Sequence, residues 1–468
     1  MNLDKSRFML FGIVAALLVL TLSLVIPPFQ FPDEPHHFAA VMIEAWGEGK
    51  RDVVESETIR LMDRYDWWRL VGMGRPAVLP ENISEIRFLM ADSAAFDFRD
   101  RIQGYVVYHK VVGRLLRVLG AASIAASYFF ARFISGAFFL IAIVFLLLSM
   151  KRLALTWNAD LKWATLLAVL IPQLSFIAVG VAPDAFVLLL GAIFFWAAIE
   201  LISGSGGIGH AGLIILSAGL GLLTDRSSMI FAGLAILLPI FIARRSNLQK
   251  IIPATLLCLV VSILLFYFLF LRFPVQIETK FLWAKSILRQ ARGAIGQLLA
   301  FDAFGQKFWL QFVDTSFLRF GWMHFGPPRV GAWLWRLAWL GGIGGVLLVL
   351  FDGSQRRIQK REAAADITRR RLIQFSIFAI FLQLFALWTY YGFAHIRPQG
   401  RYLFPLLIPF AALLASGLRR LGDIAKARLG RPLLLTFIIF EIFVWGYALW
   451  AIVVPVFRLT IRGPYPGI

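Results

Sequence analysis

The chain has 468 residues, is 59% hydrophobic with a mean hydropathy of +0.76, and carries a formal net charge of +20. Apolar runs near the ~20 residues that cross a bilayer recur along it, which excludes a soluble protein and predicts an all-α integral membrane protein. The Lys and Arg residues gather in short loops between these runs, as the positive-inside rule expects, so no nucleic-acid partner is predicted. The single Cys258 excludes an internal disulfide.

The first apolar run, Phe8–Ile26, follows Lys5 and Arg7 and lacks a small-residue cleavage site. We interpret it as an uncleaved membrane helix whose N-terminus is cytoplasmic. The polar stretch 27–121 then forms a first extracytoplasmic loop. It is too long for a simple connector, which favours a functional loop.

This loop opens with a proline cluster and two carboxylates, Pro27-Pro28-Phe29-Gln30-Phe31-Pro32-Asp33-Glu34-Pro35-His36-His37-Phe38. The prolines stop the first helix, and Pro35 suits the first position of a new helix with Asp33 or Glu34 near its cap. One apolar stripe at helical spacing follows, formed by Phe38, Val41, Met42, Ala45 and Trp46, and Gly47 ends it. The pattern predicts a short helix in the membrane interface that presents two carboxylates at its start.

A second amphipathic segment closes the loop. Its apolar face is predicted to hold Tyr108, Val111, Val112, Leu115 and Leu119, while His109, Lys110, Arg114 and Arg117 point elsewhere. The first loop is therefore expected to begin and end with an interfacial, juxtamembrane helix.

The remaining apolar runs predict further spans at about 123–150, 161–181, 184–203, 251–271, 332–351, 372–391, 403–417 and 432–456. Between 211 and 244 an apolar stretch is split at Thr224-Asp225-Arg226-Ser227-Ser228, which predicts two short helices or a re-entrant pair. The total is about eleven transmembrane helices, or about nine with a re-entrant pair. They form one transmembrane domain over 1–468 with no separate soluble domain, a second extracytoplasmic loop at 272–330 and an extracytoplasmic C-terminus.

Ionisable and aromatic residues collect at the predicted extracytoplasmic edge, where buried charges are costly unless paired or functional. They are Asp33, Glu34, His36, His37, Asp184, Asp225, Arg226, Trp322, His324, His395, Arg397, Arg401 and Tyr402, with Arg132 a few turns into the second span. Simpler roles stay open: helix capping for the acids, contact with lipid headgroups for Arg132, Arg397 and Arg401, and an interfacial place for the histidines.

Carboxylates that face arginines at membrane level indicate a reaction class. Arginine binds phosphate through parallel hydrogen bonds, and a carboxylate at the same depth can deprotonate a hydroxyl group. An acceptor hydroxyl, a phosphate leaving group and this depth together describe glycosyl transfer from a lipid-linked phosphosugar. A sugar-nucleotide donor would need a soluble α/β domain with a nucleotide fingerprint, and the sequence has neither. Asp33 and Glu34 also offer the oxygen ligands that Mg²⁺ or Mn²⁺ prefers, so a metal cofactor is left open and no metal site is assigned.

Several motifs, in this order and spacing, resemble a bacterial family of multi-pass membrane proteins of unknown function that is grouped with the GT-C glycosyltransferases. They are Pro27-Pro28 through Pro32-Asp33-Glu34 and His37-Phe38, Arg132, Pro172 with Pro183-Asp184, Ser316-Phe317 with Phe320-Gly321-Trp322, and Gln399-Gly400-Arg401-Tyr402-Leu403-Phe404-Pro405.

The resemblance implies a polyprenyl-phosphate-linked sugar donor and an inverting transfer. It makes Asp33 the general base with Glu34 in support, and Arg397, Arg401 and Arg132 the candidates for the donor phosphate. The chain departs from the family at Gly104-Tyr105-Val106-Val107-Tyr108, where relatives have a Pro-rich aromatic run. This departure bears on the acceptor more than on the fold.

The sequence therefore predicts a GT-C-type membrane glycosyltransferase that moves a hexosyl or pentosyl group to an extracytoplasmic glycan or lipid-linked acceptor. We expect it in the bacterial inner (plasma) membrane with its site facing the periplasm or exterior. One alternative is a surface-polysaccharide polymerase or ligase, which would tolerate Asp33→Asn. Others are a lipid-linked glycan transporter or flippase, for which charges near the bilayer midplane are expected, and a non-catalytic assembly partner.

Overall fold

The computed structural model describes residues 5–31, 33–65, 67, 106–120, 123–157, 168–242, 303–317, 329–355, 364–394, 399–424 and 430–447, and isolated positions 260, 278, 282, 285 and 289. Within them every regular element is a helix. The predicted pocket residues Trp322, His324, His395 and Arg397 lie outside the described residues, as do most of the second loop and the middle of the first.

The described α-helices, in chain order, are α1 (Lys5–Val25), α2 (Glu34–Trp46), α3 (Arg51–Arg64), α7 (Val106–Leu119), α8 (Ile124–Trp157), α10 (Pro172–Ala178), α11 (Asp184–Ser203), α12 (Ile208–Leu222), α13 (Ile230–Ile242), α16 (Ala303–Phe317), α17 (Arg329–Gln355), α18 (Ala364–Ala394), α19 (Leu407–Ile424) and α20 (Gly430–Tyr447). Three 3₁₀ helices join them: η1 (Glu48–Lys50), η3 (Arg226–Met229) and η6 (Gly400–Leu406).

Five helical stretches in the described part of the chain are long and apolar enough to cross a membrane: Ile124–Ala154, Asp184–Ser203, Arg329–Leu348, Ile367–Thr389 and Gly400–Arg419. They confirm the prediction of an all-helical protein with several membrane helices, and they indicate a multi-pass membrane protein. The segments α12 and α13 are two shorter apolar helices, joined by η3, that pack against each other. The choice between about nine and about eleven spans stays a prediction.

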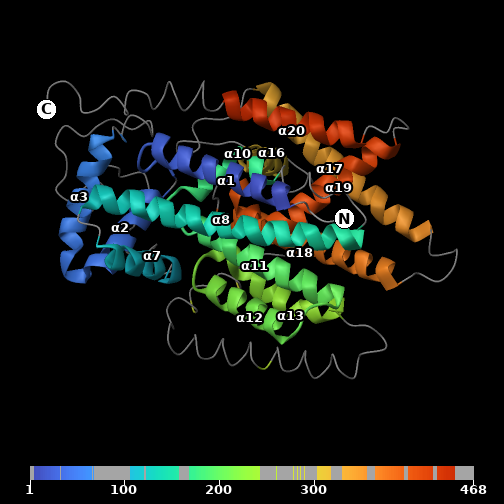
Figure 1. The fold of residues 1–468 in the computed structure, drawn as a ribbon, viewed down its shortest axis with the longest axis horizontal. Coiled ribbons are helices and arrows are strands. Elements are labelled where there is room, and N and C mark those ends of the chain that lie inside the picture. Colours follow the sequence, from blue (N-terminus) through green and yellow to red (C-terminus); the bar gives the residue numbers. More distant parts are fainter. Residues whose placement is uncertain are drawn as a thin grey trace.

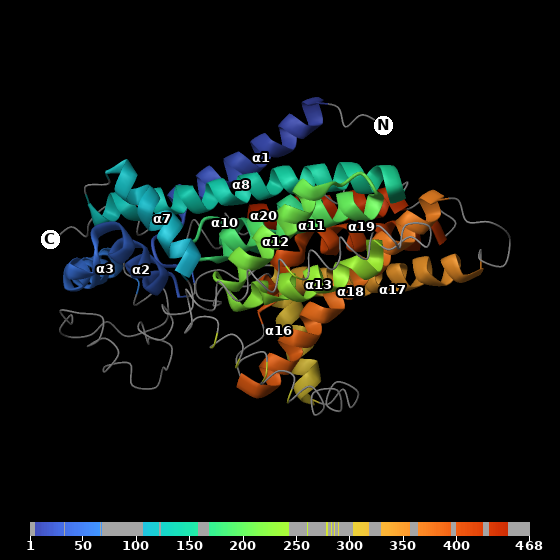
Figure 2. The same cartoon turned by 90° about the horizontal axis from the view of Figure 1, so that it is seen from below.

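The long helices lie along one another, and α8 runs beside both α1 and α11 (Figure 1). The helices α2, α3 and α7 gather at one end of the molecule's long axis in both views (Figures 1 and 2). The bundle therefore carries its first-loop helices as a cluster at one end, next to the start of α8.

The helices α17 and α19 cross at glycines. A Cβ atom on Gly345 would collide with the backbone of Gly417, and one on Gly417 would collide with the carbonyl of Gly342. These glycines let the backbones of the two helices come into contact. Membrane helices commonly associate in this way, because the hydrophobic effect does not favour helix association within lipid.

The first predicted interfacial helix is confirmed as a helix. It begins at Glu34 with Pro35 in its first turn, and Gly47 ends it at φ +95°. Its apolar residues Phe38, Val41 and Met42 are fully buried against the neighbouring helices. Proline and glycine thus bound this helix as expected.

The second predicted interfacial helix, α7, forms as well, and its predicted apolar face is buried only in part. Tyr108 and Val112 of that face are buried, whereas Leu115 and Leu119 are exposed and His109 is buried in their place. The cause is Gly113, whose face meets α2 so closely that a Cβ atom would lie 2.8 Å from the carbonyl oxygen of Val41. Because α7 is anchored through its glycine, the contact face is rotated away from the one with the most apolar residues.

Candidate functional site

The turn between α1 and α2 holds two non-glycine residues, Phe29 and Asp33, at φ 64°. For Phe29 this left-handed conformation is strained and needs support from its surroundings. The Phe29 N–H donates to the Tyr128 hydroxyl at 3.0 Å, and the Trp67 indole donates to the Phe29 carbonyl at 3.0 Å. Its ring packs against Phe38 and Tyr128. The turn that presents Asp33 is therefore held from several sides.

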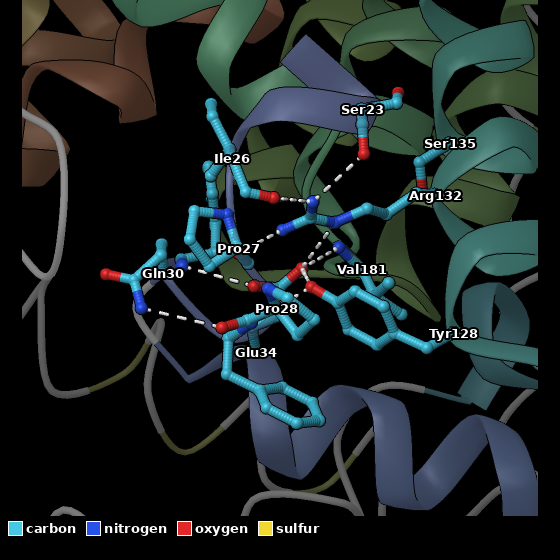
Figure 3. Close-up of polar contacts among 12 residues, drawn as sticks. Ser23, Ile26, Pro27, Pro28, Gln30, Glu34, Tyr128, Arg132, Ser135 and Val181 are labelled. Atoms are coloured by element: carbon cyan, nitrogen blue, oxygen red, sulfur yellow. Dashed lines mark hydrogen bonds and ion pairs between the residues drawn. The ribbon is translucent and has the colours of Figure 1, made fainter. Parts of the chain in front are cut away.

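Glu34 is completely buried and connects three parts of the fold (Figure 3). Its Oε1 accepts from the Tyr128 hydroxyl at 2.6 Å and from the Val181 N–H at 2.9 Å, and its Oε2 accepts from the Phe31 N–H at 3.2 Å. A carboxylate that is buried and already accepts three hydrogen bonds is satisfied by the protein. Glu34 therefore positions the turn that carries Asp33, and its role in support of Asp33 stays a prediction.

Arg132 is 1% exposed and holds the end of α1 (Figure 3). Its terminal nitrogens donate to the carbonyls of Ser23 at 3.3 Å, Pro27 at 2.8 Å and Ile26, and its Nε lies 3.7 Å from Glu34 Oε1. Carbonyls at a helix C-terminus lack partners within the helix and favour a cation. Neither predicted role of Arg132, phosphate binding or headgroup contact, fits this position, because its terminal donors are used within the fold.

A second buried arginine forms the centre of a different cluster. The Nε of Arg401, in η6, lies 3.8 Å from Oδ1 of Asp184, the first residue of α11, and the guanidinium carbon lies 5.3 Å from the centre of the Tyr402 ring. Asp33 is within electrostatic range of both Asp184 and Arg401, and Asp225 is within range of Asp184 and Tyr402. The structure thus brings together five of the predicted pocket residues from four separate segments of the chain.

Arg401 is 7% exposed, and its Nε and Nη1 have no hydrogen-bond partner among the described residues. A buried guanidinium whose one described ion pair is at 3.8 Å remains under-compensated. Its free N–H groups, in a fixed planar fork, suit an anion that brings oxygen acceptors.

Two polar side chains that the sequence analysis missed hold the Arg401 segment in place. The Gly400 N–H donates to Oγ1 of Thr315 in α16 at 2.8 Å, and Nε2 of Gln383 in α18 donates to the Tyr402 carbonyl at 2.6 Å. Gly400 itself lies against Ser316, where any Cβ atom would collide. Thr315 and Gln383 stand within apolar helices, and that placement is the signal that points to them.

The other two predicted acids, Asp184 and Asp225, differ in whether they cap a helix. Asp184 makes no capping hydrogen bond and is the first helical residue of α11, so its interpretation as a plain N-cap was wrong. Asp225 caps η3, accepting from the Ser227 N–H at 2.8 Å and from the Ser227 hydroxyl. Arg226 follows it in η3, and its side chain lies outside the described part.

The two histidines contribute to helix packing. His37 Nδ1 lies 3.1 Å from His109 Nε2 and the two rings stack, which joins α2 to α7. His36 is buried in α2.

Nearby, burial raises the pKa of Tyr108, whose hydroxyl stays protonated and forms a hydrogen bond of 2.9 Å with the Ser135 hydroxyl. Among the described residues no group of three or more His, Cys, Asp or Glu side chains could hold a metal ion.

The described residues define a class: an all-helical protein with several candidate membrane helices, in which a buried arginine with two unpartnered nitrogens pairs with a carboxylate. Comparison of the chain with known protein families, with curated proteins and with solved structures found no match.

Proposed function

We propose that this chain is a GT-C-type membrane glycosyltransferase. It moves a sugar from a polyprenyl-phosphate-linked donor to an extracytoplasmic glycan or glycolipid acceptor, with inversion. The observation that carries the proposal is the buried Arg401 guanidinium, which has two nitrogens without a hydrogen-bond partner among the described residues and lies within electrostatic range of Asp33. An anion site and a carboxylate in one place are what transfer from a phosphate-linked donor requires.

In this reaction Asp33 accepts the proton of the acceptor hydroxyl as that oxygen bonds to the anomeric carbon. The bond between the anomeric carbon and the phosphate oxygen breaks, and its electron pair leaves with the phosphate. Arg401 stabilises the negative charge that develops there, with Arg397 as a second candidate ligand. A single displacement of this kind inverts the anomeric centre.

Asp33 suits the role of base better than the neighbouring acids do. Glu34 is saturated with hydrogen bonds, Asp184 pairs with Arg401, and the carboxylate of Asp225 caps η3. Asp33 is half-buried, stands at the N-cap position of α2 and lies within electrostatic range of Arg401. No step is assigned to Mg²⁺ or Mn²⁺.

The test is complementation of a gene deletion with wild type, with Asp33→Asn or with Asp52→Asn, followed by analysis of surface glycans and lipid-linked sugars. Asp52 is an exposed acid of α3 and serves as the matched control. We expect Asp33→Asn to accumulate to the wild-type level, to lose ~10²–10⁴-fold of transfer activity, and to build up a polyprenyl-phosphate sugar. Full restoration of the glycan by Asp33→Asn would overturn the assignment of the base and favour a polymerase or ligase.

A further inference from the structure

Two buried amide oxygens lie beside the Arg401 segment without a hydrogen-bond partner. They are Oε1 of Gln311 in α16 and Oε1 of Gln399, the residue that precedes η6. Both atoms are inaccessible to solvent, and within the described residues no donor reaches either of them.

The hydrogen bond between Thr315 and Gly400 places the two amides at one junction. Gln311 stands one helical turn before Thr315 on the same face of α16, because residues four apart on a helix are neighbours. Gln399 directly precedes Gly400, whose N–H donates to Thr315 Oγ1 at 2.8 Å. Both glutamines are thus tied to the contact between α16 and η6, and Gln399 is two residues from Arg401.

The chemistry of these atoms restricts what can satisfy them. Along α16, Phe308 and Phe312 stand three residues before and one residue after Gln311, are fully buried and offer no donor. A buried acceptor without a donor costs free energy, and a phosphate, which offers acceptor oxygens, cannot satisfy it. The complementary group is a ligand rich in hydroxyl donors.

We propose that Gln311 and Gln399 form a subsite that accepts hydrogen bonds from hydroxyl groups of the donor's sugar ring while Arg401 holds the attached phosphate. This inference rests on the proposed function. The sugar is assigned to the donor because a ring esterified to the phosphate at Arg401 lies next to that phosphate, where Gln399 stands.

The test measures binding to the full-length protein in detergent micelles. The probes are farnesyl phosphate and its glucosyl, galactosyl, mannosyl and N-acetylglucosaminyl esters. The variants are Gln311→Leu, Gln399→Leu and Arg401→Gln, with Gln374→Leu, an exposed glutamine of α18, as the matched control.

We expect at least one ester to bind wild type about tenfold more tightly than farnesyl phosphate does. Each of Gln311→Leu and Gln399→Leu should reduce this gain severalfold without weakening farnesyl phosphate, which also shows that the variants fold. Gln374→Leu should retain the full gain.

The subsite is overturned if no ester exceeds farnesyl phosphate, or if both leucine variants keep the whole gain. Free methyl hexosides that bind without phosphate, and that lose affinity in the same leucine variants, would overturn the assignment to the donor. Farnesyl phosphate affinity that Arg401→Gln leaves unchanged would instead remove the phosphate site of the proposed function, and this subsite with it.

Discussion

Two clusters in this protein have matching compositions and differ in how fully their arginine is hydrogen-bonded. In one, Arg132 lies over the ring of Tyr128 with Glu34 beside it, and in the other Arg401 lies over the ring of Tyr402 with Asp184 beside it. Both terminal nitrogens of Arg132 donate to backbone carbonyls and its Nε has no hydrogen-bond partner, whereas Nε and Nη1 of Arg401 both lack one among the described residues.

The difference separates a structural ion pair from a candidate site. A cluster whose terminal donors are used within the fold has little capacity left for a ligand, and its charges serve the fold. The Arg401 cluster keeps more unsatisfied donors at a cost in stability, a state that is common at functional sites.

Removal of Glu34 should have the largest effect on stability, because it takes away the carboxylate that pairs with Arg132. Glu34→Ala strands Arg132 as a buried charge, and the loss of one partner of such a pair costs about 3–5 kcal/mol. We expect a strongly lowered melting temperature in detergent and little folded protein. Glu48→Ala, which removes a largely exposed partner of Arg51, should cost about 0–1 kcal/mol. Equal melting temperatures for the two variants would contradict a structural role for Glu34.

Arg401→Gln should produce the opposite pattern. Loss of a charge that stabilises the leaving phosphate is expected to lower the transfer rate about 10²–10³-fold. The melting temperature should fall much less than that of Glu34→Ala, because the carboxylate left behind, Asp184, keeps a side chain that is 20% exposed. Transfer assays and thermal unfolding of one preparation measure both, and a melting temperature that falls as far as that of Glu34→Ala would mean that Arg401 is as structural as Arg132.

Thr315→Val should have the smallest effect. It tests a residue that positions the Arg401 segment but is not proposed to contact the substrate. The variant keeps the shape of the side chain but leaves the Gly400 N–H without its acceptor, a loss of about 1 kcal/mol. We expect roughly five- to tenfold weaker transfer and restoration by Thr315→Ser, which returns the hydroxyl. If Thr315→Ser is as weak as Thr315→Val, the methyl packing of Thr315 and not its hydrogen bond positions Arg401.

The sequence was sufficient to predict those helices whose ends are determined by nearby residues. Pro35 and Gly47 set the bounds of α2, and the long apolar runs give the candidate spans. The contact face of α7 could not be predicted in this way, because it depends on how closely Gly113 approaches α2.

The residue types of the site could be predicted from the sequence, but which of these residues contact one another could be predicted only in part. Asp33, Asp184 and Arg401 were expected in one pocket, and the structure places them within electrostatic range of one another. Arg132 was predicted to belong to the same pocket. The sequence shows that this arginine lies in an apolar run, but it does not show which carbonyl groups accept its hydrogen bonds. Its acceptors at the end of α1 lie more than 100 residues earlier in the chain.

The contact of Arg132 with α1 also has a consequence for biogenesis. An arginine inside an isolated membrane helix is costly unless its charge is compensated. The carbonyls of Ser23, Ile26 and Pro27 are synthesised before Arg132, so the acceptors for its charge already exist when α8 leaves the ribosome. The order of the two helices along the chain therefore supplies a docking partner for α8 at the moment of its insertion.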